Sequence, residues 1–515
     1  MTTSNHTESV AYKMLLRFEG ALNKIFGNDL NPFYYLGALG FFFFWVIAVS
    51  GAYLYAFYKT GIELSYPSVE YLTHEQWYFG GIMRSLHRYA SDALVVVMAL
   101  HLLREYILGR YRGARWFAWI TGVLLIWLIY ATGINGYFMS WDKLAQYVTV
   151  GTMEWFDWLP IFGSPLSQSF VSQEVLNDRF FSLISFSHAT FPLFVLFFLW
   201  IHILRISYPV VNPKRGLMLG MLLAMLVLAL IKPALGQGPA DMGIEPRNIG
   251  IDWFYLFIFP LLDVWSAGQV WALVTGITLL LCVLPWLPTR FRQIPVAEVN
   301  LKYCSGCRLC VADCPYEAVV MKPRSDSMHF PEEAVVVPDR CVSCGICVGS
   351  CPSSTPFRSE ADYVSGIEMP SLPISGLRAA MVNDLAKLEG DARVMVFGCD
   401  NAANVEELRG DGVAVMSLPC TAMLPPSFIE YALHEHRADG VFITGCREHD
   451  CYHRTGGLWT EQRLDRVREP RLRGRAEHER VRLFWASSED YRELALELES
   501  FRSSLPIADL PKRAD

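Results

Sequence analysis

Charged residues are scarce in this chain: Lys, Arg, Asp and Glu make up 18% of its 515 residues, whereas hydrophobic residues make up 52%. The formal net charge is −7, so the chain lacks the basic excess that is typical of nucleic-acid binding. A cleavable signal peptide is also not expected, because residues 1–32 are polar and amphipathic and the first apolar run is too long for a signal h-region. The composition therefore argues against a nucleic-acid partner and for a chain that is partly embedded in a membrane.

Six apolar runs are long enough to cross a bilayer as helices. They cover about residues 33–58, 80–108, 117–139, 180–206, 217–235 and 268–289, and a shorter stretch at 251–262 is expected to be a surface or re-entrant segment. Lys and Arg concentrate before the first span and after the second, fourth and sixth spans, where Arg290 and Arg292 follow the last. By the positive-inside rule both termini face the cytoplasm. We therefore expect a multi-pass protein of the cytoplasmic membrane whose later residues lie on the cytoplasmic side.

Four histidines lie inside the predicted spans, in two pairs with one spacing. His87 and His101 are 14 residues apart, and so are His188 and His202. A helix rises about 1.5 Å per residue, so this interval separates two ligands by about 21 Å on nearly the same helix face. Because the second and fourth spans run in the same direction, we expect His87 to pair with His188 at an outer haem and His101 with His202 at an inner one.

The alternative is that these histidines are satisfied by hydrogen bonds within the bundle. Polar side chains at membrane depth are costly and usually functional, and four of them sharing one spacing favour haem ligation. Glycines repeat the interval, with Gly37 and Gly51 on the first span and Gly122 and Gly136 on the third. Since glycine lets a flat macrocycle approach a helix backbone, these positions support the haem interpretation.

All but one of the 13 cysteines fall into three groups, and two of the groups are tight runs of the form C-x2-C-x2-C-x3-C-P at 304–315 and 341–352. This spacing would strain most disulfide pairings and matches iron–sulfur ligation in a reducing compartment, whereas zinc sites, the alternative, lack such a run. The fourth cysteine of each run ligates the other cluster in this pattern. The expected 4Fe–4S sets are Cys304, Cys307, Cys310 and Cys351 (the Cys304 set), and Cys341, Cys344, Cys347 and Cys314 (the Cys341 set).

The third group is looser and comprises Cys399, Cys420, Cys446 and Cys451 (the C-terminal set). Short β-rich runs alternate with helical stretches after Arg393, which predicts an α/β domain with a parallel sheet. The first three cysteines end predicted strands, and strand ends in such a fold can converge on one point. Spacing alone leaves both metal ligation and buried free thiols open.

The surroundings of this third group carry further polar residues. His449 and His453 flank its last cysteine and are expected at the surface. Residues 454–482 are rich in arginine but interleaved with acids, so we expect a solvated face there, with docking of a partner as the alternative.

Residues 33–293 resemble the cytochrome b of quinol-oxidising cytochrome bc complexes, cut after its sixth helix. The matching pieces are Arg84-x2-His87, His101-x2-Arg104, Gly136-Tyr137 with Ser140-Trp141, and His188-x3-Pro192. The resemblance implies that the haems are haem b, that Arg84 and Arg104 bind their propionates, and that the cytochrome b part forms a dimer.

The segment at 251–255 resembles the Pro-Glu-Trp-Tyr element of that family's outer quinol site. Here isoleucine replaces the proline, Asp252 replaces the glutamate, and Phe254 is an extra residue. The resemblance implies a candidate quinone site made of Asp252, Trp253 and Tyr255.

Residues 298–360 resemble bacterial two-cluster ferredoxins. Further along, Phe397-Gly398-Cys399, Pro419-Cys420 and the segments 445–453 and 482–501 resemble the delta subunit of methyl-viologen-reducing hydrogenases. This second resemblance implies that the C-terminal set holds a 2Fe–2S cluster, although Ala402 stands where the family usually has a further cysteine. It also implies docking on a heterodisulfide-reductase-like FAD subunit, with a NAD(P)- or ferredoxin-dependent soluble enzyme behind it.

These patterns together predict a multi-domain membrane protein with an all-α transmembrane di-haem helix bundle. The expected parts are a cytoplasmic segment (1–32), the bundle (33–293), an α+β ferredoxin-like double-cluster domain (298–360), a linker (361–390), an α/β iron–sulfur domain (391–503) and a tail (504–515). The expected function is electron transfer between a cytoplasmic flavin partner and the quinone pool. A passive membrane anchor and relay, or the reverse direction with quinol reducing low-potential carriers, are the alternatives.

Overall fold

The computed structural model describes residues 10–27, 30–170, 176–204, 209–246, 248–287, 295–360, 363–390, 392–435, 438–447, 450–473, 478–488 and 490–505. His449, Arg290 and Arg292 therefore lie outside the described residues. The chain divides into two compact units. The helical unit comprises Ile25–Leu204 and Val210–Leu287, and the cysteine-rich unit comprises Met1–Lys24, Arg205–Pro209 and Pro288–Asp515.

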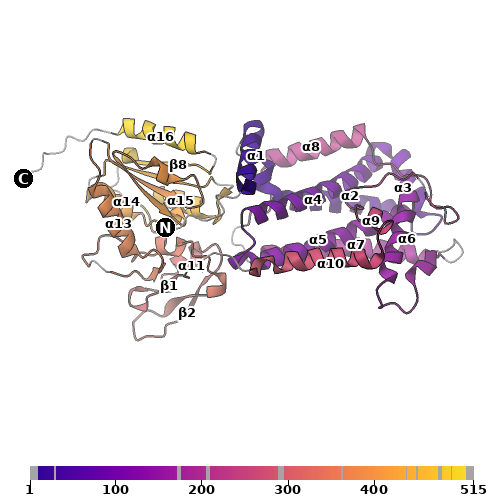
Figure 1. The fold of residues 1–515 in the computed structure, drawn as a ribbon, viewed down its shortest axis with the longest axis horizontal. Helices are drawn as coiled ribbons and strands as arrows, with labels where there is room; N and C mark the ends of the chain where they lie inside the picture. The colour runs from indigo at the N-terminus through magenta and orange to yellow at the C-terminus, as the bar shows by residue number, and fades with distance from the viewer. Residues whose placement is uncertain are drawn as a thin grey trace, which may run out of the picture. The chain divides into compact units, whose positions relative to one another are not determined.

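Long helices run side by side in the helical unit (Figure 1). They are α2 (Leu36–Phe57), α4 (Ile82–Ile107), α5 (Trp116–Ser140), α7 (Asp178–Ile203), α8 (Arg215–Ile231) and α10 (Ala267–Val283). Within the described residues, four segments are long and apolar enough to cross a membrane: Pro32–Phe57, Trp116–Ser140, Asp178–Ile203 and Ala267–Trp286. The other two predicted spans correspond to α4 and α8, which do not meet these two conditions. The helix α4 carries several charged side chains, and α8 has only 17 residues.

Shorter elements connect these helices. They are α3 (Ser65–His74), a π-helical turn (Trp77–Gly81), α6 (Lys143–Asp157) and α9 (Phe259–Leu262). Asp142 caps α6 by accepting a hydrogen bond from the Ala145 amide at 2.9 Å, and Ser266 and Gln269 form a capping box at the start of α10. The segment predicted to be re-entrant is a turn-rich stretch that leads into α9, and its Tyr255 is buried.

The ferredoxin-like part of the cysteine-rich unit has two small antiparallel pairs. β1 (Glu298–Val299) pairs with β4 (Ile367–Glu368), and β2 (Val319–Pro323) pairs with β3 (Glu332–Val336). Each cysteine run contains a one-turn helix, α11 (Leu309–Asp313) or α12 (Ile346–Gly349). The residues before these helices, Arg308 and Gly345, have φ values of 66° and 75°, so the chain reverses tightly just before the third cysteine of each run.

The C-terminal part is an α/β layer structure with a four-stranded parallel sheet in the order β6-β5-β7-β8, which confirms the predicted α/β class. The strands are β5 (Val394–Cys399), β6 (Val413–Leu418), β7 (Gly440–Gly445) and β8 (Val481–Trp485). The helices α13 (Ile374–Ala386) and α14 (Ser427–His434) pack on one face, and α16 (Tyr491–Ser504) packs on the other. Alternate residues of β5 point to opposite faces of the sheet. Phe397 packs in the core on the α13 and α14 side, and Val396 packs in the core on the α16 side.

Two other segments belong to this unit. The predicted linker differs from the structure, because β4 pairs with β1 and α13 buries Ile374, Leu377 and Met381 completely. One face of α13 and the strand β4 therefore pack into the core, so part of that stretch is structured rather than a linker. The helix α15 (Gly456–Leu464) follows the last cysteine, and α1 (Val10–Phe26) reaches the same unit through a 3.2 Å contact between the Tyr12 and Ser488 hydroxyls.

Candidate haem and iron–sulfur sites

His87 on α4 and His188 on α7 face each other inside the helical unit. Their ring centroids are 6.2 Å apart. An imidazole nitrogen binds a metal at about 2 Å, so a metal between two facing rings needs centroids on the order of 6 Å apart. The observed separation therefore fits an axial ligand pair.

Hydrogen bonds fix the tautomer of these two rings. The Nδ1 atom of His87 lies 3.0 Å from the Ile47 carbonyl oxygen, and that of His188 lies 3.0 Å from the Thr132 carbonyl oxygen. A carbonyl oxygen only accepts, so Nδ1 carries the proton and Nε2 keeps a free lone pair. A metal-binding imidazole requires this tautomer, and the bond also orients the ring.

His101 and His202 lie further along the same two helices, α4 and α7. The Nδ1 atom of His202 lies 3.0 Å from the Thr121 hydroxyl oxygen. That hydroxyl donates to the Phe117 carbonyl at 2.9 Å, so it is free to accept a proton from the imidazole. His202 can therefore present Nε2 in the same way as His87 and His188.

Each of the four predicted glycines lies against one histidine ring. The nearest ring atom to a Cβ added at the glycine would be at 2.9 Å for Gly51 and His87, 2.7 Å for Gly136 and His188, 3.5 Å for Gly37 and His101, and 3.2 Å for Gly122 and His202. We predicted that these glycines make room for a macrocycle. The structure shows that the room they leave accommodates the imidazoles.

Arg84 and Arg104, the predicted propionate partners, have protein partners in this structure. Arg84 donates to the Glu70 carboxylate at 3.3 Å and to the Thr73 hydroxyl. Arg104 is 5% exposed, and its guanidinium lies 5.8 Å from the centre of the Tyr34 ring. The propionate role of both arginines stays a prediction.

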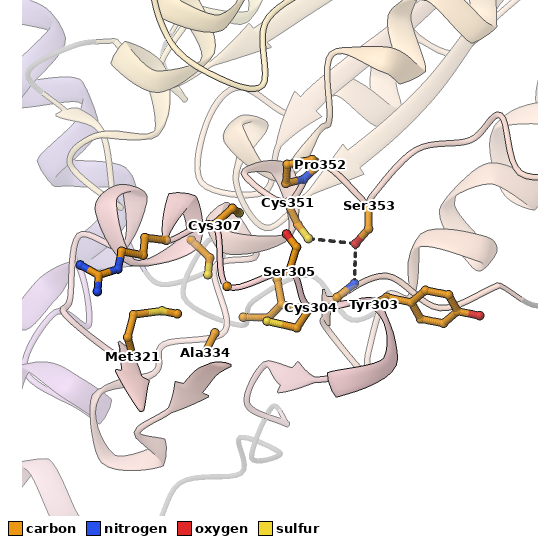
Figure 2. Close-up of a pocket in the computed structure, with 14 residues that line it drawn as sticks. Tyr303, Cys304, Ser305, Cys307, Met321, Ala334, Cys351, Pro352 and Ser353 are labelled. Atoms are coloured by element: carbon orange, nitrogen blue, oxygen red, sulfur yellow. Dashed lines mark hydrogen bonds between the residues drawn. The ribbon is translucent and has the colours of Figure 1, made fainter. Parts of the chain in front are cut away.

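The Cys304 set lines a single pocket, with three cysteines from one loop and Cys351 from the other run (Figure 2). The Ser353 hydroxyl lies 3.0 Å from the Cys351 sulfur and accepts a hydrogen bond from the Gly366 amide at 2.6 Å, which fixes the turn after Cys351. Cys307 is exposed. Four thiols around one hollow suit a cubane, so this donor set fits a 4Fe–4S cluster.

The Cys341 set lines a second pocket in the same manner. The Ala318 amide donates to the Cys314 sulfur at 3.3 Å, which orients this cysteine. The structure thus places the fourth cysteine of each run beside the other run. Among the described residues, no group of three or more His, Cys, Asp or Glu side chains has the spacing of a single-ion site.

Burial affects the protonation of these thiols. It raises the pKa of Cys310 to about 12, with contributions from the neighbouring thiols Cys351, Cys307 and Cys304, and it raises the pKa of Cys344 as well. The thiolate is the form that binds iron, so cluster loading must release these protons.

The C-terminal set converges at the carboxyl end of the parallel sheet. Cys399 ends β5, Cys446 follows β7, and their sulfurs are 3.9 Å apart. A Cβ added at Gly456 would overlap the Cys420 sulfur and lie 3.6 Å from the Cys451 sulfur. All four thiols therefore gather at one place, which favours shared ligation over four separate buried thiols.

Two side chains that the sequence placed at the surface are buried instead, and both predictions were wrong. His453 is 5% exposed, and its Nδ1 lies 3.1 Å from the Tyr316 hydroxyl. Arg463, in the arginine-rich segment, is 1% exposed, and its guanidinium lies 2.5 Å from the Asp313 carboxylate. The reason is long-range packing against the ferredoxin-like part, which local spacing does not reveal.

The predicted quinone residues point in different directions. Asp252 and Tyr255 are buried, whereas Trp253 is 65% exposed. The Tyr255 ring occupies the space beside Gly133, and its hydroxyl donates to the Ser91 carbonyl at 3.3 Å. The structure therefore brings two of the three predicted residues toward the bundle interior.

Asp252 is held by side chains that sequence reasoning did not assign to this site. Arg88 lies 2.6 Å from one carboxylate oxygen, which also accepts from the Tyr137 hydroxyl, and the other oxygen accepts from the Phe254 amide at 2.9 Å. Arg88 also faces Asp92 at 3.7 Å, one helical turn along α4. Opposite charges four residues apart inside an apolar span were the available signal for this pair.

Three family models match separate parts of the chain. The cytochrome b/b6/petB family matches residues 22–209, the 4Fe–4S dicluster domain matches residues 303–355, and the delta subunit of methyl-viologen-reducing hydrogenase matches residues 390–506. A solved chain described as a hyperthermophilic respiratory Complex III is similar over 54% of this chain and 83% of its own length, with 20% identity and a TM-score of 0.41.

The chain therefore contains a cytochrome b/b6 domain, a 4Fe–4S dicluster domain and a domain like the hydrogenase delta subunit. The cytochrome b match implies haem b, and the dicluster match implies 4Fe–4S clusters. With the four helices among the described residues that are suited to crossing a membrane, these domains make the chain a membrane electron-transfer component.

Proposed function

We propose that this chain is the electron-transfer subunit of a quinone-linked oxidoreductase. It would pass electrons between a heterodisulfide-reductase-like FAD partner on the cytoplasmic side and the quinone pool, through one 2Fe–2S cluster, two 4Fe–4S clusters and two b haems. The observation that carries the proposal is the gathering of three four-cysteine sets and a facing histidine pair in one chain. When bound, iron–sulfur clusters and haems each carry one electron at a time, while the protein binds and orients them.

The match of residues 390–506 to a hydrogenase delta subunit supports a flavoprotein as the soluble partner, with a NAD(P)- or ferredoxin-dependent enzyme behind it. The match of residues 22–209 to cytochrome b supports a dimeric membrane part and a quinone as the membrane partner. The same sites serve either direction of electron flow, including reduction of low-potential carriers by quinol.

The role of Asp252 distinguishes a chain with its own quinone chemistry from a passive membrane anchor. A general base must come within about 3 Å of the quinol hydroxyl, or reach it through one water. In the structure, one carboxylate oxygen already has Arg88 and Tyr137 as partners. A quinol hydroxyl must therefore replace one of them or pass its proton through the Tyr137 hydroxyl, while Arg88 keeps a positive charge beside the carboxylate.

The test is the replacement Asp252→Asn in the assembled complex, with electron transfer to a quinone analogue as the measurement. General-base catalysis contributes about 10²–10⁴-fold, so we expect a loss of at least about 100-fold while both haems stay bound and reducible. The control is Asp263→Asn, in the same connecting segment, where the carboxylate accepts from the Tyr147 hydroxyl at 2.8 Å. An unchanged rate in Asp252→Asn would favour the passive anchor, or a quinone site on the cytoplasmic side near His101 and His202.

A further inference from the structure

The C-terminal set packs directly beside the Cys341 set in the cysteine-rich unit. Cys420 lies in one buried cluster with Cys344 and Trp459, and Cys314 and Cys341 pack against that cluster. The Cys304 set instead lines the pocket that contains the exposed Cys307.

The two ferredoxin-like sets also adjoin each other. Cys310 of the Cys304 set and Cys347 of the Cys341 set belong to the same buried core. The three sets therefore follow one another in the order C-terminal set, Cys341 set, Cys304 set.

The C-terminal and ferredoxin-like parts approach each other at the level of the backbone. The helix α12 contains Cys347 and ends at Gly349, while the turn Thr421–Met423 directly follows Cys420. A Cβ added at Gly349 would overlap the Ala422 carbonyl oxygen and lie 2.8 Å from a guanidinium nitrogen of Arg463. Only glycine permits this approach.

Arg463 on α15 links residues that lie next to cysteines of all three sets. One of its nitrogens lies 2.5 Å from the Asp313 carboxylate and 2.8 Å from the Ser350 hydroxyl, and another donates to the Ala422 carbonyl at 2.7 Å. Ser350 in turn donates to Asp313 at 2.7 Å. These three partners lie within two residues of one ligand from each set, namely Cys314, Cys351 and Cys420.

The charges around Arg463 do not cancel. Both Arg463 and Arg468 pair with the single carboxylate of Asp313, which is 1% exposed. The Arg468 guanidinium also lies 3.3 Å from the centre of the Trp459 ring. Arg468 is 21% exposed, but Arg463 is buried, and its positive charge favours neighbouring sites when they gain an electron, because little solvent screens the attraction.

We propose that Arg463 is a positioning residue that seats the C-terminal set against the Cys341 set, so that electrons pass directly between these two sites. In each step one electron leaves one site and enters the other, and no bond or proton moves. The Cys304 set, with its exposed Cys307, is then the far end of this relay. The inference rests on the proposed function, since it requires a cluster at the C-terminal set.

Electron paramagnetic resonance of the reduced full chain tests the order of the sites. The 2Fe–2S signal should be broadened by spin coupling to the adjacent reduced cluster. We expect Cys341→Ala to remove the broadening and Cys304→Ala to leave it. The opposite pattern, or no broadening in the unaltered chain, would overturn the inference. A chain without any 2Fe–2S signal would overturn the proposed C-terminal cluster as well, so the two failures are distinguishable.

The role of Arg463 is tested with Arg463→Gln, at unchanged iron content. Spin coupling should weaken and the midpoint potential of the 2Fe–2S signal should fall, with partial recovery in Arg463→Lys, which keeps the charge but loses the planar fork. The control is Arg471→Gln, in the same segment, whose side chain is 60% exposed. Full coupling and an unchanged potential in Arg463→Gln would contradict the role.

A second variant keeps the test decisive if Arg463→Gln loses iron. Gly349→Ala separates the same two parts at a different point, so we expect the same loss of spin coupling. Its matched control is Gly410→Ala, because nothing lies within 4 Å of a Cβ added there. Coupling that persists in Gly349→Ala would show that the close approach is not required.

Discussion

At the scale of single residues, hydrogen-bond partners decide which predicted site residues can act. The Nδ1 protons of His87 and His188 are committed to backbone carbonyl oxygens, so their Nε2 atoms can serve only as acceptors or ligands. Asp252 is buried with an arginine and a tyrosine on one carboxylate oxygen, whereas its neighbour Trp253 is exposed. The resemblance identified a candidate quinone segment, but it could not show which of its side chains point inward.

Replacing His87 by alanine should remove one haem and leave the other. The remaining pair, His101 and His202, lies further along the same two helices, and the Nδ1 atom of His202 has its own partner in the Thr121 hydroxyl. Haem per chain, measured from the pyridine haemochrome spectrum, should fall by half, and the remaining haem should stay low-spin. The control is His74→Ala, whose side chain is 61% exposed and pairs with nearby Glu70. Loss of both haems, or of neither, would argue against the pairing.

At the scale of elements, repeated local patterns were predictable and contacts between distant segments were not. The cysteine runs fix their own tight turns, and the β-rich runs match β5, β6, β7 and β8. The burial of α13, His453 and Arg463 depends on segments far apart in the chain, such as Asp313 and Arg463. No periodicity within the arginine-rich stretch distinguishes the buried Arg463 from exposed arginines such as Arg471.

The packing of α15 against α11 should depend strongly on Asp313. Asp313→Ala leaves Arg463 buried without a carboxylate, and breaking a buried ion pair costs about 3–5 kcal/mol. Amide hydrogen exchange followed by mass spectrometry should show that the free energy of opening α11 and α15 drops by about this amount. Glu469→Ala removes an exposed pair with Arg471 and should change the free energy of opening by about 1 kcal/mol or less. Equal protection in the two variants would contradict the importance of the buried pair.

At the scale of the whole molecule, a cytochrome b/b6 domain, a 4Fe–4S dicluster domain and a domain like the hydrogenase delta subunit occur in one chain. The number of thiol ligands sets the capacity for non-haem iron, and the facing histidines set the capacity for haem. Sequence alone could predict both sets of candidate ligands because cluster and haem ligation impose short or regular spacings. The looser C-terminal set needed the structure, which brings thiols from three strand ends and the following loop together.

The most direct test of this account is the cofactor content of the purified full chain. Two 4Fe–4S clusters and one 2Fe–2S cluster predict about ten non-haem irons per chain. They should be accompanied by two low-spin haems and a 2Fe–2S signal in paramagnetic resonance. About eight irons without that signal, or a single or high-spin haem, would contradict the proposed relay.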